Sequence, residues 1–134
     1  MEPLSRRRNP LVLLVEDDPG LREAVVRGLT KAGYQVASAG SRREAVQSAQ
    51  DLNPDAVVMD VLLPDGEGPA AAQEIRSQAG MAGVPVLFVT AKAPAAVGDT
   101  LFPAPVLFKP FTYRQLVASV RALVTGPRSA APAR

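Results

Sequence analysis

The sequence contains no cysteine and no histidine. The absence of cysteine excludes disulfides, thiolate metal sites and cysteine nucleophiles. The absence of histidine removes the commonest general base and the commonest ligand of transition metals. Any catalytic chemistry must therefore depend on carboxylates, lysine and hydroxyl groups, with or without a hard metal ion.

Long apolar runs are absent as well. No apolar stretch approaches the ~20 residues that span a bilayer, and no secretory-type apolar segment follows the N-terminal charges. We therefore expect a cytoplasmic protein without a membrane partner. The length of 134 residues suits one domain. We expect it at residues 10–125, between flexible segments at 1–9 and 126–134.

Charge of one sign does not dominate the chain, whose formal net charge is only +2. Arg6, Arg7 and Arg8 form one short basic run near the N-terminus. Such a run can be an arm that binds nucleic acid. A solvated tail explains it better, because the run is short and has no interleaved aromatic residues.

Apolar runs of strand length alternate with helical periodicity along the chain. The pattern predicts five strands, at residues 11–15, 34–39, 56–60, 84–90 and 106–108. Helix signals lie between these strands. A first helix is predicted from the Asp18 cap and Pro19 to a stop at Gly33, and a second at 42–51 from a Ser41–Glu44 capping box. A third is predicted from the end of a 64–69 loop to about Gln78, and a last one after a Thr112–Gln115 capping box. This alternation is typical of an α/β fold, a three-layer doubly wound sandwich around a five-stranded parallel sheet.

Polar residues follow the predicted strands at the point where each strand ends. Glu16 and Asp17 follow the first strand, Asp60 and Thr90 end the third and fourth, and Lys109 follows the fifth. The carboxyl ends of parallel strands share one edge of the sheet, where such folds place their functional crevice. We therefore expect these side chains to converge there.

A carboxylate cluster of this kind repels itself unless a cation neutralises it. Its ligands are all oxygen, which favours a hard ion such as Mg²⁺. Magnesium beside an aspartate, a lysine and a hydroxyl group suits phosphoryl transfer, with the aspartate as nucleophile.

Each of these residues also has a simpler explanation. Asp18 is explained as a helix cap, and Glu16 with Asp17 could be a solvated helix start. Asp60 alone could be a turn residue, Thr90 alone a structural residue, and Lys109 alone a surface charge. Their conjunction after four different strands favours the functional interpretation.

The sequence resembles the receiver domains of bacterial two-component response regulators, with stand-alone CheY-like members. The stretches "LLVEDDP", "VVMDVLLPDGEG", "VLFVTAK" and "LFKPF" carry the resemblance, which covers about residues 10–124. It implies a flavodoxin-like sheet of strand order 2-1-3-4-5. It implies Asp60 as the phosphoacceptor and Mg²⁺ as the cofactor, bound by Asp17, Asp60 and the Leu62 backbone carbonyl, with Glu16 acting through water.

The resemblance also assigns roles to the remaining residues. Thr90 would bond to the phosphoryl group, Lys109 would bind a phosphate oxygen, and Pro110 would follow a cis bond. The sequence departs from the family at Val106, where receivers usually carry an aromatic residue. It departs again between Pro94 and Pro103, where only a shortened fourth helix of about two turns fits.

Three functions fit these observations. The first is a signalling receiver, phosphorylated on Asp60 by a histidine kinase or a histidine phosphotransfer protein. It would not be an enzyme beyond its own phosphorylation and slow dephosphorylation. It would have no DNA-binding domain, would act by protein–protein contact on an unknown target, and would be a monomer or weak dimer. The alternatives are a degenerate, phosphorylation-independent interaction module and a Mg²⁺-dependent hydrolase. The hydrolase would need a second carboxylate two residues after Asp60 as its acid–base group, and Leu62 stands at that position.

Overall fold

The computed structural model describes residues 9–91 and 104–126. The predicted flexible ends, apart from Asn9 and Gly126, and the predicted fourth helix between Pro94 and Pro103 lie outside the described residues. Within the described residues, no helix combines the length and apolar character needed to cross a membrane.

Five parallel strands form one sheet, in the order β2-β1-β3-β6-β7. The strands are β1 (Leu11–Val15), β2 (Gln35–Ala39), β3 (Ala56–Asp60), β6 (Val86–Thr90) and β7 (Val106–Phe108). This arrangement confirms the predicted fold class and strand order. Two strands start later than predicted. The first paired residue of β2 comes after Tyr34, and that of β6 comes after Val84 and Pro85.

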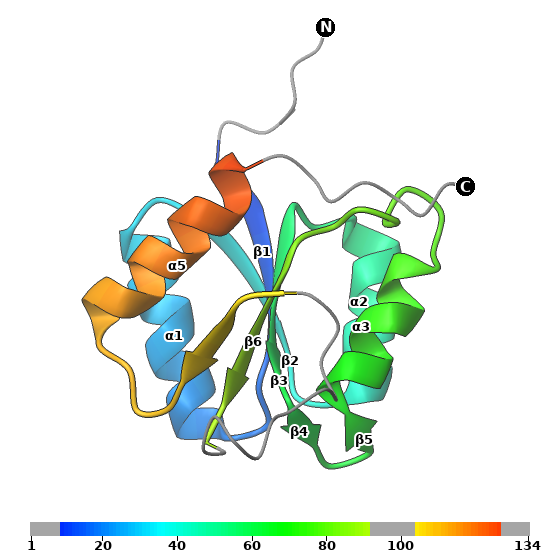
Figure 1. Ribbon diagram of the computed structural model, residues 1–134, viewed down its shortest axis with the longest axis horizontal. Helices are drawn as coiled ribbons and strands as arrows, with labels where there is room; N and C mark the ends of the chain where they lie inside the picture. Colours follow the sequence, from blue (N-terminus) through cyan, green and yellow to red (C-terminus); the bar gives the residue numbers. More distant parts are fainter. Residues whose placement is uncertain (1–8, 92–103, 127–134) are drawn as a thin grey trace, which may run out of the picture.

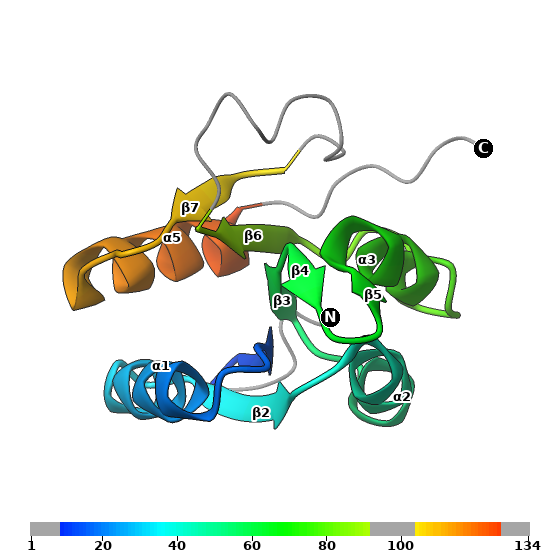
Figure 2. The ribbon, with the colours of Figure 1, turned by 90° about the horizontal axis from the view of Figure 1, so that it is seen from below.

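Helices cover both faces of the sheet (Figures 1 and 2). Helices α1 (Pro19–Lys31) and α5 (Tyr113–Thr125) lie on one face, and α2 (Arg42–Leu52) and α3 (Gly68–Arg76) lie on the other. Each face buries its own apolar cluster. Val12, Leu14 and Val58 point toward α1 and α5, while Leu13, Val57 and Met59 point toward α2 and α3. Alternate residues of the buried strands thus serve opposite layers.

The helix termini follow the predicted capping signals with one difference. Asp18 caps α1, and Thr112 with Gln115 forms a complete capping box on α5. At α2 the Ser41 hydroxyl accepts the Glu44 N–H, but the Glu44 carboxylate accepts the N–H of Gly40 instead of Ser41. The expected box is therefore extended by one residue.

The segment after Asp60 contains regular secondary structure, whereas the sequence predicted a loop at 64–69. Strands β4 (Leu62–Leu63) and β5 (Gly66–Glu67) form a short antiparallel hairpin beyond the carboxyl end of β3 (Figure 1). Helix α3 begins at Gly68, ahead of Pro69, and ends at Arg76 rather than near Gln78. This hairpin, residues 62–67, connects the candidate site to the helices on the α2–α3 face.

Candidate phosphoryl-transfer and metal site

The carboxyl ends of four strands bring the predicted residues together. Glu16 and Asp17 follow β1, Asp60 and Thr90 are the last residues of β3 and β6, and Lys109 follows β7. The parallel register places Asp60 opposite Val89 and Thr90 opposite Phe108, so these ends are level across the sheet. The predicted convergence at one edge is confirmed.

Three carboxylates form the acidic part of the site. One oxygen from each of Glu16, Asp17 and Asp60 lies within 4.8 Å of the others. Glu16 and Asp60 are 3% and 7% exposed, whereas Asp17 is open to solvent. Clustered oxygen ligands that include a solvent-facing carboxylate suit a hard divalent ion that keeps part of its water shell. The residues present therefore fit Mg²⁺.

Lys109 connects two of these carboxylates. Its Nζ atom donates to Glu16 Oε1 at 3.0 Å and to Asp60 Oδ2 at 3.1 Å. Three carboxylates against one ammonium group leave the cluster negative, so it can still attract a divalent cation. The phosphate-binding role of Lys109 stays a prediction; in this structure its partners are carboxylates.

The surroundings change the proton affinity of this pair. Burial raises the pKa of Glu16, and the nearby charge of Asp60 adds to the rise, while hydrogen bonds from the Asp18 N–H and from Lys109 oppose it. For Lys109, burial acts to lower the pKa, but the hydrogen bonds and charges of Glu16 and Asp60 outweigh it and the pKa is raised. Lys109 therefore stays cationic at neutral pH, the state in which an ammonium group can stabilise negative charge.

The acidic residues after β1 have separate roles. Asp18 Oδ1 accepts the N–H groups of Gly20 and Leu21, at 3.0 and 3.3 Å, as a helix cap does. The Asp18 N–H in turn donates to Glu16 Oε2 at 3.1 Å. The simple explanation is thus correct for Asp18. Glu16 and Asp17 remain candidate metal-binding residues.

The remaining predicted residues lie around Asp60. Thr90 is 2% exposed, and its backbone carbonyl accepts the Lys109 N–H at 2.8 Å. The Lys109–Pro110 peptide bond is cis. The Leu62 N–H donates to Asp60 Oδ1 at 3.2 Å, and the Leu62 side chain is 51% exposed. The predicted roles of Thr90 and of the Leu62 carbonyl stay predictions.

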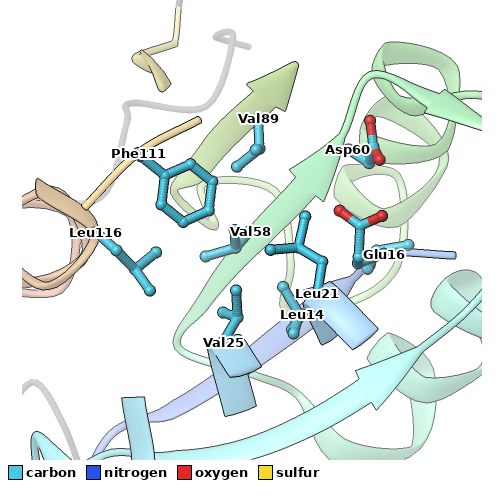
Figure 3. Close-up of a pocket in the computed structure, with 10 residues that line it drawn as sticks. Leu14, Glu16, Leu21, Val25, Val58, Asp60, Val89, Phe111 and Leu116 are labelled. Carbon is cyan, nitrogen blue, oxygen red and sulfur yellow. The ribbon is translucent and has the colours of Figure 1, made fainter. Parts of the chain in front are cut away.

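Beneath the carboxylates lies a small apolar cavity of about 10 Å³. Figure 3 shows the carboxylates of Glu16 and Asp60 facing one another beside the apolar side chains that line it, among them Leu14, Val58 and Phe111. A space of this size holds one water molecule at most. It has no room for an organic cofactor, and its apolar walls strengthen the electrostatic interactions of the carboxylates above it.

Two residues at the site were not predicted. The Arg22 Nη1 atom donates to the Glu16 carbonyl at 2.9 Å and so fixes the backbone of the acidic turn. Gly68 lies so close to the Asp60 carbonyl that a Cβ atom there would collide with it. The repeated glycines of "DGEGP" were a signal for this close approach, whereas nothing in the sequence singled out Arg22.

Known proteins match both the sequence and the fold. A family model described as "Response regulator receiver domain" matches residues 12–121. The chain is 34% identical to the transcriptional regulatory protein GltR of Pseudomonas aeruginosa over 116 residues, covering 84% of this chain and 48% of GltR. It is 32% identical over 127 residues to the alkaline phosphatase synthesis transcriptional regulatory protein PhoP of Bacillus subtilis, covering 92% of this chain and 52% of PhoP.

Among solved structures, the receiver domain of sensor histidine kinase PA1611 from Pseudomonas aeruginosa PAO1 matches with a TM-score of 0.81 and 30% identity. The match covers 88% of this chain and 99% of that domain, which carries a magnesium ion coordinated in its active site cleft. The chain thus spans about half the length of the curated relatives it matches, and nearly all of an isolated domain.

Proposed function

The chain belongs to the family of response regulator receiver domains of two-component systems, and on that premise we propose that it accepts a phosphoryl group on Asp60 with Mg²⁺ as cofactor. The observation that carries the proposal is the position of Asp60. It ends a central strand, has Glu16 and Asp17 within 4.8 Å, and accepts a hydrogen bond from Lys109.

The phosphoryl transfer uses the Asp60 carboxylate as nucleophile. An Asp60 oxygen forms a bond to phosphorus as the bond from phosphorus to the donor's imidazole nitrogen breaks. The bonding electron pair stays on that nitrogen, which then takes a proton from solvent. Lys109 supplies positive charge beside the phosphorus oxygens, and Thr90 supplies a hydroxyl at the neighbouring strand end. Mg²⁺, held by Asp17, Asp60 and the Leu62 carbonyl with Glu16 nearby, would neutralise charge on the phosphoryl oxygens.

The proposed partners are a phosphohistidine donor and a target protein. The donor is a histidine kinase or a histidine phosphotransfer protein, and the output is a contact between the receiver surface and another protein domain. The relatives GltR and PhoP are transcriptional regulators about twice as long as the match. For this chain we propose only self-directed chemistry, namely its own phosphorylation and dephosphorylation.

A degenerate receiver that binds partners without phosphorylation is the second candidate. Val106 favours it, because this half-buried residue of β7 has no ring that could change between buried and exposed positions. The convergence of Glu16, Asp17, Asp60 and Lys109 favours the phosphoacceptor. A hydrolase is the weakest candidate, because the exposed Leu62 offers no acid–base group.

Intact mass after incubation with acetyl phosphate tests the proposal. With Mg²⁺ present, the wild type should gain one phosphoryl group, and with the ion removed by chelation it should gain none. Asp60→Asn should stay unmodified, whereas Asp51→Asn, a change on the exposed face of α2, should be modified like the wild type. Unmodified wild type in Mg²⁺ would leave the degenerate receiver as the better description.

A further inference from the structure

The hairpin after the phosphoacceptor is attached to helix α2 by one side chain. The Asp65 carboxylate at its tip accepts the Arg42 N–H through Oδ1 at 2.7 Å and the Arg43 N–H through Oδ2 at 3.0 Å. Arg42 and Arg43 are the first two residues of α2, whose N–H groups have no partner within the helix. Both oxygens of Asp65 are thus used to hold the hairpin against α2.

The Arg42 side chain makes a second connection across the same hairpin. A Cβ atom on Gly66 would lie 3.0 Å from Arg42 Cδ, so the turn backbone lies directly against the arginine stem. The guanidinium group then donates through Nε and Nη2 to Glu74 Oε1 on α3, at 3.1 and 3.0 Å. Helix α2, the hairpin and α3 are therefore joined at one place.

The other end of the hairpin is fixed at the candidate site. The Leu62 N–H donates to Asp60 Oδ1, and the Gly68 N–H donates to the Val61 carbonyl at 2.7 Å, which closes the segment at its base. A segment closed at its base and anchored at its tip has little freedom to rotate its peptide groups. The Leu62 peptide, which the proposed function assigns to the metal site, lies between these two fixed points.

We propose that Asp65 is a positioning residue for the metal site. It holds the hairpin so that the Leu62 peptide keeps one orientation relative to Asp60 before any ion binds. This inference rests on the proposed function. Its physical basis is that Mg²⁺ demands a nearly ideal ligand arrangement, so the cost of ordering a mobile ligand segment reduces the affinity directly. The competing explanation is that Asp65 only caps α2 and stabilises the fold.

Two variants separate these explanations. Asp65→Ala removes the hairpin contact and two caps of α2, while Ser41→Ala removes a cap of the same helix and leaves the hairpin contact intact. The readouts are the Mg²⁺ dissociation constant by calorimetry, the melting temperature, and the hydrogen exchange of the Leu62 amide without divalent ions. Asp65→Asn, which keeps the side-chain shape and one acceptor oxygen, provides the conservative variant if Asp65→Ala does not fold.

Asp65→Ala should raise the Mg²⁺ dissociation constant about tenfold, as the loss of a residue that orients metal ligands does, and should speed Leu62 exchange. Asp65→Asn should give a smaller rise. Ser41→Ala should lower the melting temperature and leave the dissociation constant within about twofold of the wild type. Equal Mg²⁺ affinity in Asp65→Ala and wild type, or an equal loss in Ser41→Ala, would overturn the positioning role alone. A wild type that binds no Mg²⁺ would overturn the proposed function as well.

Discussion

Lys109 Nζ and Glu16 Oε1 lie 3.0 Å apart, although the two residues are 93 positions apart in the sequence. Glu16 is nearly buried and Lys109 is mostly covered, so each supplies the charge that makes the other's burial tolerable. Because Lys109 also donates to Asp60, its ammonium group lies where it opposes a second cation at the same carboxylates. We therefore expect metal binding and phosphoryl acceptance to respond differently to a change at Lys109.

Replacing Lys109 by methionine should tighten Mg²⁺ binding and slow phosphorylation. The variant keeps the apolar stem but loses the competing charge, which is worth about 1 kcal/mol, so the Mg²⁺ dissociation constant should fall about fivefold. Phosphorylation by acetyl phosphate should slow by about tenfold or more, because no ammonium group stabilises the phosphoryl oxygens. Calorimetry and intact mass measure the two effects. The control is Lys31→Met at the end of α1, and weaker Mg²⁺ binding in Lys109→Met would contradict the competition.

Asp60→Asn should stabilise the protein in the absence of divalent ions. It removes one of three clustered carboxylates, keeps the side-chain volume and keeps an acceptor oxygen for the Leu62 N–H. We expect the free energy of unfolding, measured with urea, to rise by about 1 kcal/mol. Asp51→Asn on the outer face of α2 should change it by less than about 0.5 kcal/mol. A lower stability of Asp60→Asn than of wild type would show that the Lys109 ion pair outweighs the repulsion.

Leu62→Asn should shorten the lifetime of the phosphorylated protein. Hydrolysis needs a water in line with the phosphorus, and the exposed Leu62 side chain offers that water no hydrogen bond. An amide at this position can orient the water, and one such hydrogen bond corresponds to roughly a tenfold faster loss of phosphate. Leu62→Met controls for the change of side chain. Equal half-lives of Leu62→Asn and wild type, followed by intact mass, would show that an amide at this position does not orient the attacking water.

The contact of Asp65 with α2 should make a pH-dependent contribution to stability. The Arg42 and Arg43 N–H groups lower the pKa of Asp65 below its ordinary value of 3.8. The folded state thus binds the Asp65 proton less readily than the unfolded state, and this contribution is fully present above pH 3.8 and is lost as the pH falls through the lowered pKa. Urea unfolding of wild type and Asp65→Ala should show a constant difference near neutral pH that shrinks below pH 3.8. A difference that grows on acidification would contradict the assignment.

The strand ends were predictable from the sequence because parallel topology fixes them. Asp60 and Thr90 end apolar runs of strand length, and parallel strands bring their carboxyl ends to one edge whatever the loops do. The convergence of Glu16, Asp60 and Lys109 followed from that rule alone. Which carboxylates Lys109 contacts could not be derived from that rule, because the choice among nearby carboxylates depends on distances that only the packed structure defines.

The connections around the hairpin were beyond sequence reasoning. Asp65 lies 22 and 23 residues from its partners, and its sequence context, after Pro64 and before Gly66, indicates only a turn. That this turn meets the N-terminus of α2 depends on how two helices pack on one face of the sheet. Arg22 was missed for the same reason. It donates to a backbone carbonyl, and since every residue carries one, no residue type indicates the contact.

Gly68→Ala should damage both stability and the site, because Gly68 lies against the backbone of the phosphoacceptor. An added Cβ would collide with the Asp60 carbonyl oxygen and would lie 3.0 Å from Met59 Cγ. Backbone cannot move aside as a flexible side chain can, so we expect a loss of about 3 kcal/mol in the free energy of unfolding. Because the collision would displace Asp60, Gly68→Ala should also lower the Mg²⁺ affinity.

Gly20→Ala is the matched control, since its Cβ would meet only Asp18 Oδ1 at 3.5 Å. Alanine there should be neutral or stabilise α1 by up to about 1 kcal/mol. Urea unfolding and calorimetry of the two variants measure both effects, and a Gly68→Ala protein as stable as Gly20→Ala would show that α3 can shift away from the site without cost.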